Sequence, residues 1–121
     1  MDLLTDLSSI LVDLGIPHET GAHTDPAPDT YAILTPVDDT FAVQGDGHPL
    51  CEAQEVRISL FCRRSYLALK RRIEHAVLAA EMTITSRRYV RFETDTKYHH
   101  YAIDVANLYH YEMEEQHGSE I

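Results

Sequence analysis

Histidines and carboxylates are the side chains of this chain best suited to chemistry, because they can bind metal ions or move protons. The chain has eight histidines among its 121 residues, and His99 and His100 are adjacent. On a strand, adjacent side chains point to opposite faces, so these two cannot bind one ion together without distortion. His110 shares the side of His100 but lies far along the same predicted strand. Since no Cys-x-x-Cys or His-Glu-x-x-His motif is present, we expect no metal and no cofactor, only histidines that gain a proton on mild acidification.

Catalytic motifs are equally scarce in the sequence. The chain contains no Gly-x-Ser-x-Gly motif and no glycine-rich phosphate loop. Asp38 or Asp46 together with Glu55 could bind the divalent cation of a small nuclease, which is the enzymatic alternative. Asp38 and Asp39 are also typical of a turn, where aspartate binds the local backbone. We therefore expect no catalytic residues and a protein that is not an enzyme.

The two cysteines, Cys51 and Cys62, have neither metal-binding nor redox spacing. We expect reduced thiols in a cytosolic compartment rather than a disulfide, and small apolar packing groups rather than ligands. The N-terminal residues show no basic stretch before an apolar one, and no apolar stretch is long enough to span a bilayer. We therefore expect neither a secretory signal nor contact with a membrane.

Charge is sorted along the chain. Residues 1–56 contain eleven acidic residues and no Lys or Arg, residues 57–98 contain ten basic and four acidic residues, and residues 99–121 contain five acidic residues. The net charge of −10 argues against specific nucleic-acid binding, which needs a basic face. A chain of this kind can fold into a subunit with one acidic and one basic surface. Such a subunit can bind a copy of itself head to tail, and contacts of this type generate rings when the rotation closes.

We expect the basic middle segment to meet the acidic first half of a neighbouring copy. Phe61 lies on the polar side of its predicted strand and could anchor such an interface, since Phe and Arg are enriched there; cover by a loop is the alternative. The predicted subunit interface consists of Arg57, Phe61, Arg63, Arg64, Arg87, Arg88, Arg91, Asp38 and Asp39.

Residues 3–14 predict an amphipathic helix, because six apolar side chains recur on one face. These side chains are Leu3, Leu4, Leu7, Ile10, Leu11 and Leu14. Asp2 is suited to cap the N-terminus of this helix, Gly15 to adopt a left-handed conformation after its end, and Pro17 to stop it.

Residues 18–29 predict a loop, because glycine and proline interrupt any regular pattern there. Tyr31–Thr35 and Phe41–Val43 predict two short strands, joined by a turn at Asp38 and Asp39. An exposed loop is predicted from Gln44 to Leu50. Its central residues are Gln44, Gly45, Asp46, Gly47 and His48.

Residues 53–63 alternate between apolar and polar side chains and predict a strand with one buried face. Ser65 can cap a second helix that runs to about Glu81. Met82–Ile84 and Tyr89–Thr94 predict strands on either side of a bend at residues 86–88. Residues 98–113 predict a long final strand with apolar residues on both sides, which is typical of a central strand.

These elements predict an α+β fold with a mainly antiparallel sheet of four or five strands and two helices packed on one face. Residues 1–113 are expected to form a single domain, since the sequence has no internal repeat and no linker. Residues 114–121 are polar and acidic, and we expect them to be disordered.

The order of elements also resembles that of a known family. The opening helix ends at Gly15-Ile16-Pro17, Thr30-Tyr31-Ala32-Ile33 begins the sheet, and the alternating strand Val56–Phe61 leads to a helix near Tyr66. Tyr89 then leads to Asp95-Thr96-Lys97-Tyr98-His99-His100-Tyr101 and a final strand. Over residues 3–113 this layout resembles the tail-completion proteins of long-tailed phages and prophages, also called tail terminators or head–tail joining proteins.

The resemblance implies a non-enzymatic assembly protein. Members of this family form a ring, commonly of six subunits, that stops polymerisation of the tail tube at its head-proximal end and presents a surface for the head connector. The resemblance therefore implies a homo-oligomer whose partners are the tail tube protein and the head connector or stopper. It also implies a place in the virion after assembly in the host cytoplasm. The exposed loop would project from the ring, and an acidic lumen would let DNA pass without sticking. The alternative within this class is another virion assembly module, such as a head-side connector or a tail assembly factor.

Overall fold

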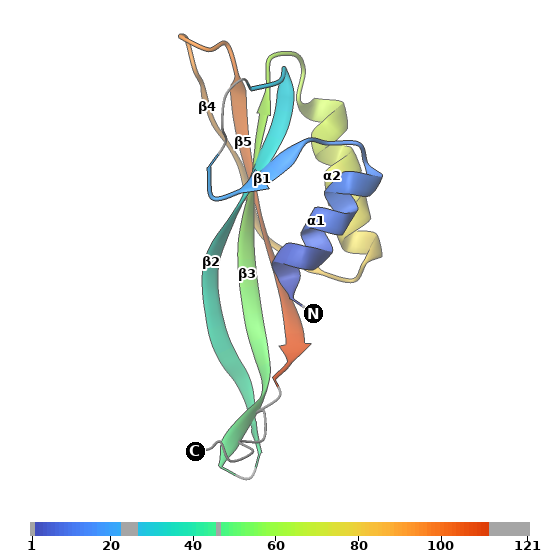
Figure 1. Cartoon of the computed structure of the whole chain (residues 1–121), viewed down its shortest axis with the longest axis vertical. Helices are drawn as coiled ribbons and strands as arrows, with labels where there is room; N and C mark the ends of the chain where they lie inside the picture. Colours follow the sequence, from blue (N-terminus) through green and yellow to red (C-terminus); the bar gives the residue numbers. More distant parts are fainter. Residues whose placement is uncertain (1, 23–26, 46, 112–121) are drawn as a thin grey trace, which may run out of the picture.

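Five strands form one mixed sheet, and both helices lie on the same side of it (Figure 1). The structure, a computed structural model, describes residues 2–22, 27–45 and 47–111. Its elements are α1 (Leu3–Asp13), β1 (His18–Thr20), β2 (Thr30–Gly45), β3 (His48–Cys62), α2 (Leu67–Ala79), β4 (Thr83–Phe92) and β5 (His99–His110). The strands lie in the order β1-β2-β3-β5-β4, and all neighbours are antiparallel except β1 and β2. The predicted α+β class is confirmed, and the sheet, predicted to be mainly antiparallel, contains one parallel pair, β1 with β2.

Helix α1 begins and ends where its sequence predicts. The Asp2 carboxylate accepts a hydrogen bond from the Thr5 backbone N–H at 2.8 Å, which satisfies one of the free donors of the first turn. Gly15 has a φ of +74°, and the Ile16 backbone N–H returns to the Leu11 carbonyl at 2.9 Å. This left-handed residue closes the helix and turns the chain toward the sheet.

Strand β1 lies in a segment for which the sequence predicts only a loop. It has three residues and pairs in parallel with Ala32–Leu34 of β2. The Pro17 carbonyl accepts a hydrogen bond from the Ala32 N–H at 2.9 Å, and the Gly21 N–H donates to the Leu34 carbonyl at the same distance. Three residues are too few to show an alternating pattern, so the pairing is set by the neighbouring strand rather than by local sequence.

Strand β2 replaces the two predicted short strands, and the predicted turn at Asp38 and Asp39 is wrong. The strand runs for 16 residues and tolerates Pro36 because the proline lies on the outer edge beyond β1. Register shifts between Pro36 and Asp38 and between Phe41 and Val43 mark bulges that bend the strand without ending it.

The predicted exposed loop from Gln44 to Leu50 is also wrong as a loop. Strand β2 continues to Gly45 and β3 begins at His48, so a tight turn joins them, with Gly47 at a φ of +81°. Asp46 lies outside the described residues, as does the acidic segment 114–121 for which disorder was predicted. The hairpin itself extends well beyond the helices (Figure 1).

The remaining boundaries differ less from the prediction. Strand β4 is one strand of 10 residues, and a bulge at Thr85 takes the place of the predicted bend at residues 86–88. A second register shift separates Tyr89 from Arg91. Helix α2 and strand β5 lie where the sequence predicts them; α2 is shorter by a few residues, and the last two residues predicted for β5, 112 and 113, lie outside the described residues. Within the described residues, no helix is both long and apolar enough to cross a membrane.

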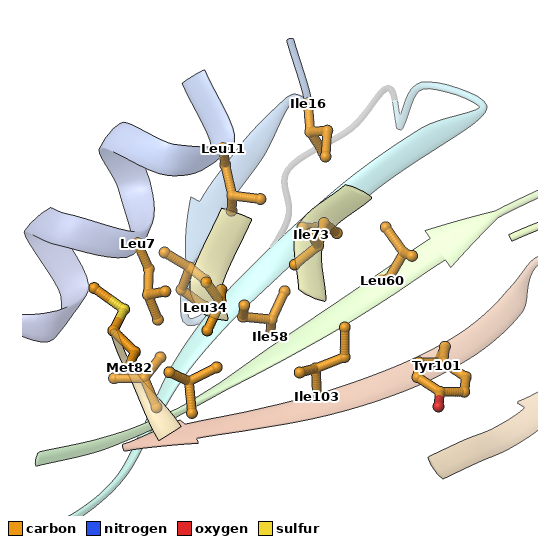
Figure 2. Close-up of a cluster of buried hydrophobic side chains, with 14 of the residues drawn as sticks. Leu7, Leu11, Ile16, Leu34, Ile58, Leu60, Ile73, Met82, Tyr101 and Ile103 are labelled. Atoms are coloured by element: carbon orange, nitrogen blue, oxygen red, sulfur yellow. The ribbon is translucent and has the colours of Figure 1, made fainter. Parts of the chain in front are cut away.

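The core fills the space between the helices and one face of the sheet (Figure 2). Helix α1 contributes Leu3, Leu7 and Leu11, all with no exposed surface, and α2 contributes Ile73 and Val77. The sheet contributes alternate residues of its three central strands, as the period of a strand requires. These are Ala32, Leu34, Val56, Ile58, Leu60, Cys62, Tyr101, Ile103 and Val105.

The sheet has two free edges. Strand β4 forms one edge along its whole length. Strand β1 covers the other edge only beside Ala32–Leu34, so among the described strands none pairs with the outer side of β2 from Thr35 onward. Free edges carry unpaired backbone donors and acceptors and can add a strand from another molecule.

Candidate subunit interface

The sheet face away from the helices, here the open face, carries an aromatic row. Tyr31, Phe61 and His100 lie side by side on β2, β3 and β5. The Phe61 ring stacks on Tyr31 at a centroid distance of 4.9 Å and on His100 at 4.4 Å. Phe61, predicted as an interface anchor, is therefore half-buried among rings of its own chain.

Arg63 is held at the end of β3 by contacts within the chain. Its guanidinium donates to Asp29 Oδ1 at 3.0 Å and to the Thr96 carbonyl at 2.9 Å. It also lies 4.4 Å from the ring centre of Tyr98, a buried residue whose hydroxyl donates to the Pro28 carbonyl at 2.5 Å. These contacts tie the loop before β2 and the turn between β4 and β5 to the end of the sheet.

Arg57 forms an ion pair on the open face that is held by two hydrogen bonds. It donates from Nε and Nη2 to the two carboxylate oxygens of Asp104, at 2.7 and 3.0 Å. Asp104 lies directly opposite on β5 and is only 6% exposed. The hydrogen bond to Asp104 raises the pKa of Arg57, in opposition to the effect of desolvation. Because Arg57 is paired with Asp104 of its own chain, it contributes to the stability of the fold. The geometry gives no support for its predicted role in the interface.

The arginines of β4 form a basic edge, defined by Arg87, Arg88 and Arg91. All three are exposed on the outermost strand. Arg87 donates one hydrogen bond to Glu74 of α2 at 3.1 Å, and Arg91 lies 3.7 Å from Glu93. Within the described part of the chain, Arg88 forms no ion pair. The basic edge therefore keeps charge and hydrogen-bond donors for a partner.

Asp38 and Asp39 form an acidic edge on the uncovered stretch of β2. Both are exposed, and neither forms an ion pair with any described residue. Asp38 lies opposite Glu55 and shares the open face with it, whereas Asp39 lies opposite Gln54 on the helix side. Arg64, the last predicted interface residue, is exposed in the connection between β3 and α2, apart from both edges.

Sequence reasoning missed two hollows on the helix side, one beside each edge. Beside the basic edge, a hollow of about 570 Å³ lies between α2 and β4. It is lined by Glu74, His75, Leu78, Met82, Thr83, Ile84 and Arg87. Beside the acidic edge, a hollow of about 170 Å³ is lined by Asp2, Leu4, Pro36, Asp39, Gln54 and Val56. The first depends on how α2 packs along β4, and the second on contacts of α1 with β2 and β3, so the periodicity of the sequence revealed neither.

Exposed apolar side chains accompany these edges. Phe41 on β2 is 55% exposed, although its ring meets the edge of Tyr111 at 4.9 Å. Tyr89 on β4 is 42% exposed, and Leu108 on the open face of β5 is 58% exposed. Aromatic side chains beside arginine are typical of the centre of protein–protein interfaces.

Residues considered for metal chemistry lie close together only in part. Asp38 is the register partner of Glu55, whose carboxylate accepts a hydrogen bond from Thr85 at 2.6 Å. The described residues contain no group of three or more His, Cys, Asp or Glu that could hold a metal ion. His99 and His100 point to opposite faces: His99 accompanies Tyr89 and the helix side, whereas His100 stacks in the open-face row.

Comparison with known proteins gives no further information on the function of this surface. No protein-family model matches the sequence, and no curated protein matches it significantly. The family resemblance noted in the sequence therefore stays a prediction, and the case for a function depends on the two charged edges.

Proposed function

We propose that this protein is a structural ring subunit of a phage or prophage tail, of the tail-completion or tail-terminator type. Copies of the chain would join head to tail into a ring, with six subunits as the resemblance implies. The ring would close the head-proximal end of the tail tube and join the tail to the head. The observation that carries this proposal is the opposite charge of the two free edges of the sheet, on Arg87 and Arg88 and on Asp38 and Asp39.

Opposite charges on the two edges favour one mode of association. If two copies met through the same edge, they would place arginine beside arginine or aspartate beside aspartate, which is unfavourable. Contact between different edges pairs the charges instead, and this heterologous contact leaves one free edge of each kind for the next copy. Such contacts close into rings when the rotation between copies permits.

The partners and the location follow from the resemblance. The ring would bind the tail tube protein on one side and the head connector or stopper on the other, as part of the virion tail. The β2–β3 hairpin, which extends beyond the helices, is suited to reach one of these partners along the ring axis (Figure 1). Leu50, an exposed apolar residue of this hairpin, would meet that partner.

Light scattering combined with size-exclusion chromatography tests the self-association. We expect an oligomer whose population increases with protein concentration and decreases between about 50 and 500 mM salt, because exposed charges are screened within about 8–10 Å at physiological ionic strength. A population that does not respond to salt would contradict the electrostatic basis of the ring.

Cross-linking in a tail assembly reaction tests the location. The proposal predicts cross-links to the tail tube protein and to the head connector. Cross-links to the connector alone would favour the head-side alternative, and cross-links to an assembly chaperone alone would favour the tail assembly factor. Metal-dependent cleavage of DNA or RNA by the pure protein, lost on Glu55→Gln, would favour the nuclease alternative.

A further inference from the structure

The two free edges fit each other in direction. Strand β4 is antiparallel to β5, β5 to β3 and β3 to β2, so β4 and β2 of one copy run in opposite directions. When copies with similar orientation stand side by side, β4 of one therefore meets β2 of the next in the antiparallel sense. Antiparallel strands can pair directly, with their hydrogen bonds perpendicular to the strands.

We propose that β4 of one copy adds to the uncovered part of β2 in the next copy, so that the sheet continues across the subunit boundary. Arg87 would lie opposite the neighbour's Asp39, and Arg88 opposite its Asp38. This inference depends on the head-to-tail association of the proposed function, and it adds the surfaces and the register.

Bulges and side-chain direction select this register. On β4 the bulges leave the regular stretch Ser86–Tyr89, and on β2 they leave Asp38–Phe41. A continuous sheet requires residues of the same face to lie opposite one another. Arg88 and Asp38 both belong to the open face, whereas Arg87 contacts α2 and Asp39 lines a hollow beside α1. The proposed register satisfies both faces and gives each arginine an opposite charge.

The lengths of the two edges also agree. Strand β4 has 10 residues, and β2 is uncovered from Thr35 to Gly45. If the proposed register continues, Arg91 lies close to the neighbour's Thr35. Thr35 is the first residue of β2 beyond those that β1 pairs, so β4 would fill the free edge and stop beside β1.

In the proposed pairing, each hollow also receives a side chain from the neighbouring copy. On the helix side, the neighbour's Phe41 would lie beside the bulge at Thr85, next to Ile84, which lines the 570 Å³ hollow together with Leu78. In the other direction, Arg87 would reach the 170 Å³ hollow lined by Asp2 and Asp39. An exposed aromatic ring would thus meet Leu78, Met82 and Ile84 in the first hollow, and a cation would meet Asp2 and Asp39 in the second.

The stagger between copies is compatible with a closed sheet. Arg88 lies in the row of Ser59, and Asp38 lies in the row of Glu55, four residues away along β3. Four residues correspond to about 13 Å along the strand, and the four strand spacings of each copy to roughly 19 Å across it. The resulting strand tilt is about 35°, which lies within the typical range for closed sheets.

Disulfide cross-linking between two singly substituted proteins tests the register. Cys51→Ser and Cys62→Ala remove the native thiols, and circular dichroism establishes that this background folds. Arg88→Cys and Asp38→Cys are then made separately, mixed and mildly oxidised. Residues directly opposite in an antiparallel pair have the Cα separation that a disulfide needs. We expect at least tenfold more cross-linked dimer from this mixture than from the matched mixture of Arg88→Cys with Asp39→Cys, whose thiols lie on opposite faces.

Each outcome decides a specific point. The proposed pairing is overturned if light scattering shows oligomers but the 88–38 cross-link does not form. It is also overturned if Arg88→Cys cross-links equally to positions 38 and 39. Both outcomes leave the ring in place. A strict monomer at every concentration overturns this inference together with the self-association of the proposed function.

A second pair of variants tests the hollow independently. Phe41→Ala should raise the dissociation constant for self-association about tenfold or more. Leu108→Ala, which removes an equally exposed apolar side chain from the open face, should leave it unchanged. Equal effects of the two variants would overturn the assignment of Phe41 to the interface.

Discussion

Replacing Arg57 by alanine separates residues that stabilise the fold from residues that join copies. Arg57→Ala would leave the Asp104 carboxylate, which is 6% exposed, without its cation and without two hydrogen bonds of 2.7 and 3.0 Å. Arg88→Ala is the matched control, because Arg88 is exposed on the same face and forms no ion pair with a described residue.

The expected loss of stability follows from the exposure of the two partners. Removing one partner of a fully buried ion pair costs about 3–5 kcal/mol, whereas an exposed pair contributes about 0–1 kcal/mol. The Asp104 side chain is 9% exposed but that of Arg57 is 34% exposed, so water compensates part of the loss. We expect Arg57→Ala to lower the free energy of unfolding by about 2–3 kcal/mol, and Arg88→Ala to change it by less than about 0.5 kcal/mol.

Urea unfolding and light scattering, applied to both variants, measure the two effects. Arg57→Ala should shift the urea midpoint downward with little change in slope, and it should retain self-association at concentrations where it is folded. Arg88→Ala should keep the midpoint and weaken self-association. If Arg57→Ala left the midpoint unchanged and weakened self-association as Arg88→Ala does, Arg57 would belong to the interface and our assignment would be wrong.

Three further predictions concern the fold. Burial, together with the hydrogen bond to Asp6, raises the pKa of Tyr109 to about 12, so its neutral form stabilises the fold fully below pH 10 and this contribution is lost as the pH rises toward 12. Tyr109→Phe should cost about 1 kcal/mol at pH 7 and flatten the fall in urea midpoint above pH 10; an unchanged alkaline slope would contradict this. Burial lowers the pKa of His100, so the contribution of its neutral ring to the free energy of unfolding should be fully present above pH 6.5 and decrease below that pH. His100→Phe should keep the ring contact with Phe61 and show a smaller decrease in urea midpoint between pH 7.5 and 5. Leu7→Ala, at a side chain with no exposed surface, should lower the free energy of unfolding by about 2–5 kcal/mol, and a loss below 1 kcal/mol would contradict its place in the core.

Local sequence patterns predicted the elements whose formation depends on neighbouring residues. The spacing of leucines, together with Asp2 and Gly15, predicted α1 and its ends, because capping and amphipathicity depend on a few neighbouring residues. The alternation in residues 53–63 predicted the greater part of β3. The pairing partners of β1 and the continuity of β2 through Pro36 depend on a neighbouring strand, so the sequence predicted a loop and a turn instead.

The candidate interface was predictable as a charge pattern but not as a surface. The sequence predicted one interface group that contains Arg57 and Arg88, because both belong to the basic segment 57–98. Only the register shows that Arg57 lies opposite Asp104, whereas Arg88 lies on the outermost strand with its charge unpaired among the described residues. Phe41 carried no signal in the sequence, because its relevance depends on a hollow formed by α2 and β4.

Exchange of the charges on the two edges tests the central claim, that oppositely charged edges join copies head to tail. Light scattering at low salt would compare the natural protein with Arg88→Asp, with Asp38→Arg and with the protein carrying both substitutions. We expect each single substitution to raise the dissociation constant at least tenfold, and the double substitution to restore association, because the ion pair is re-formed with reversed polarity. Association that stays weak in the double variant, or that neither single substitution weakens, would contradict the account.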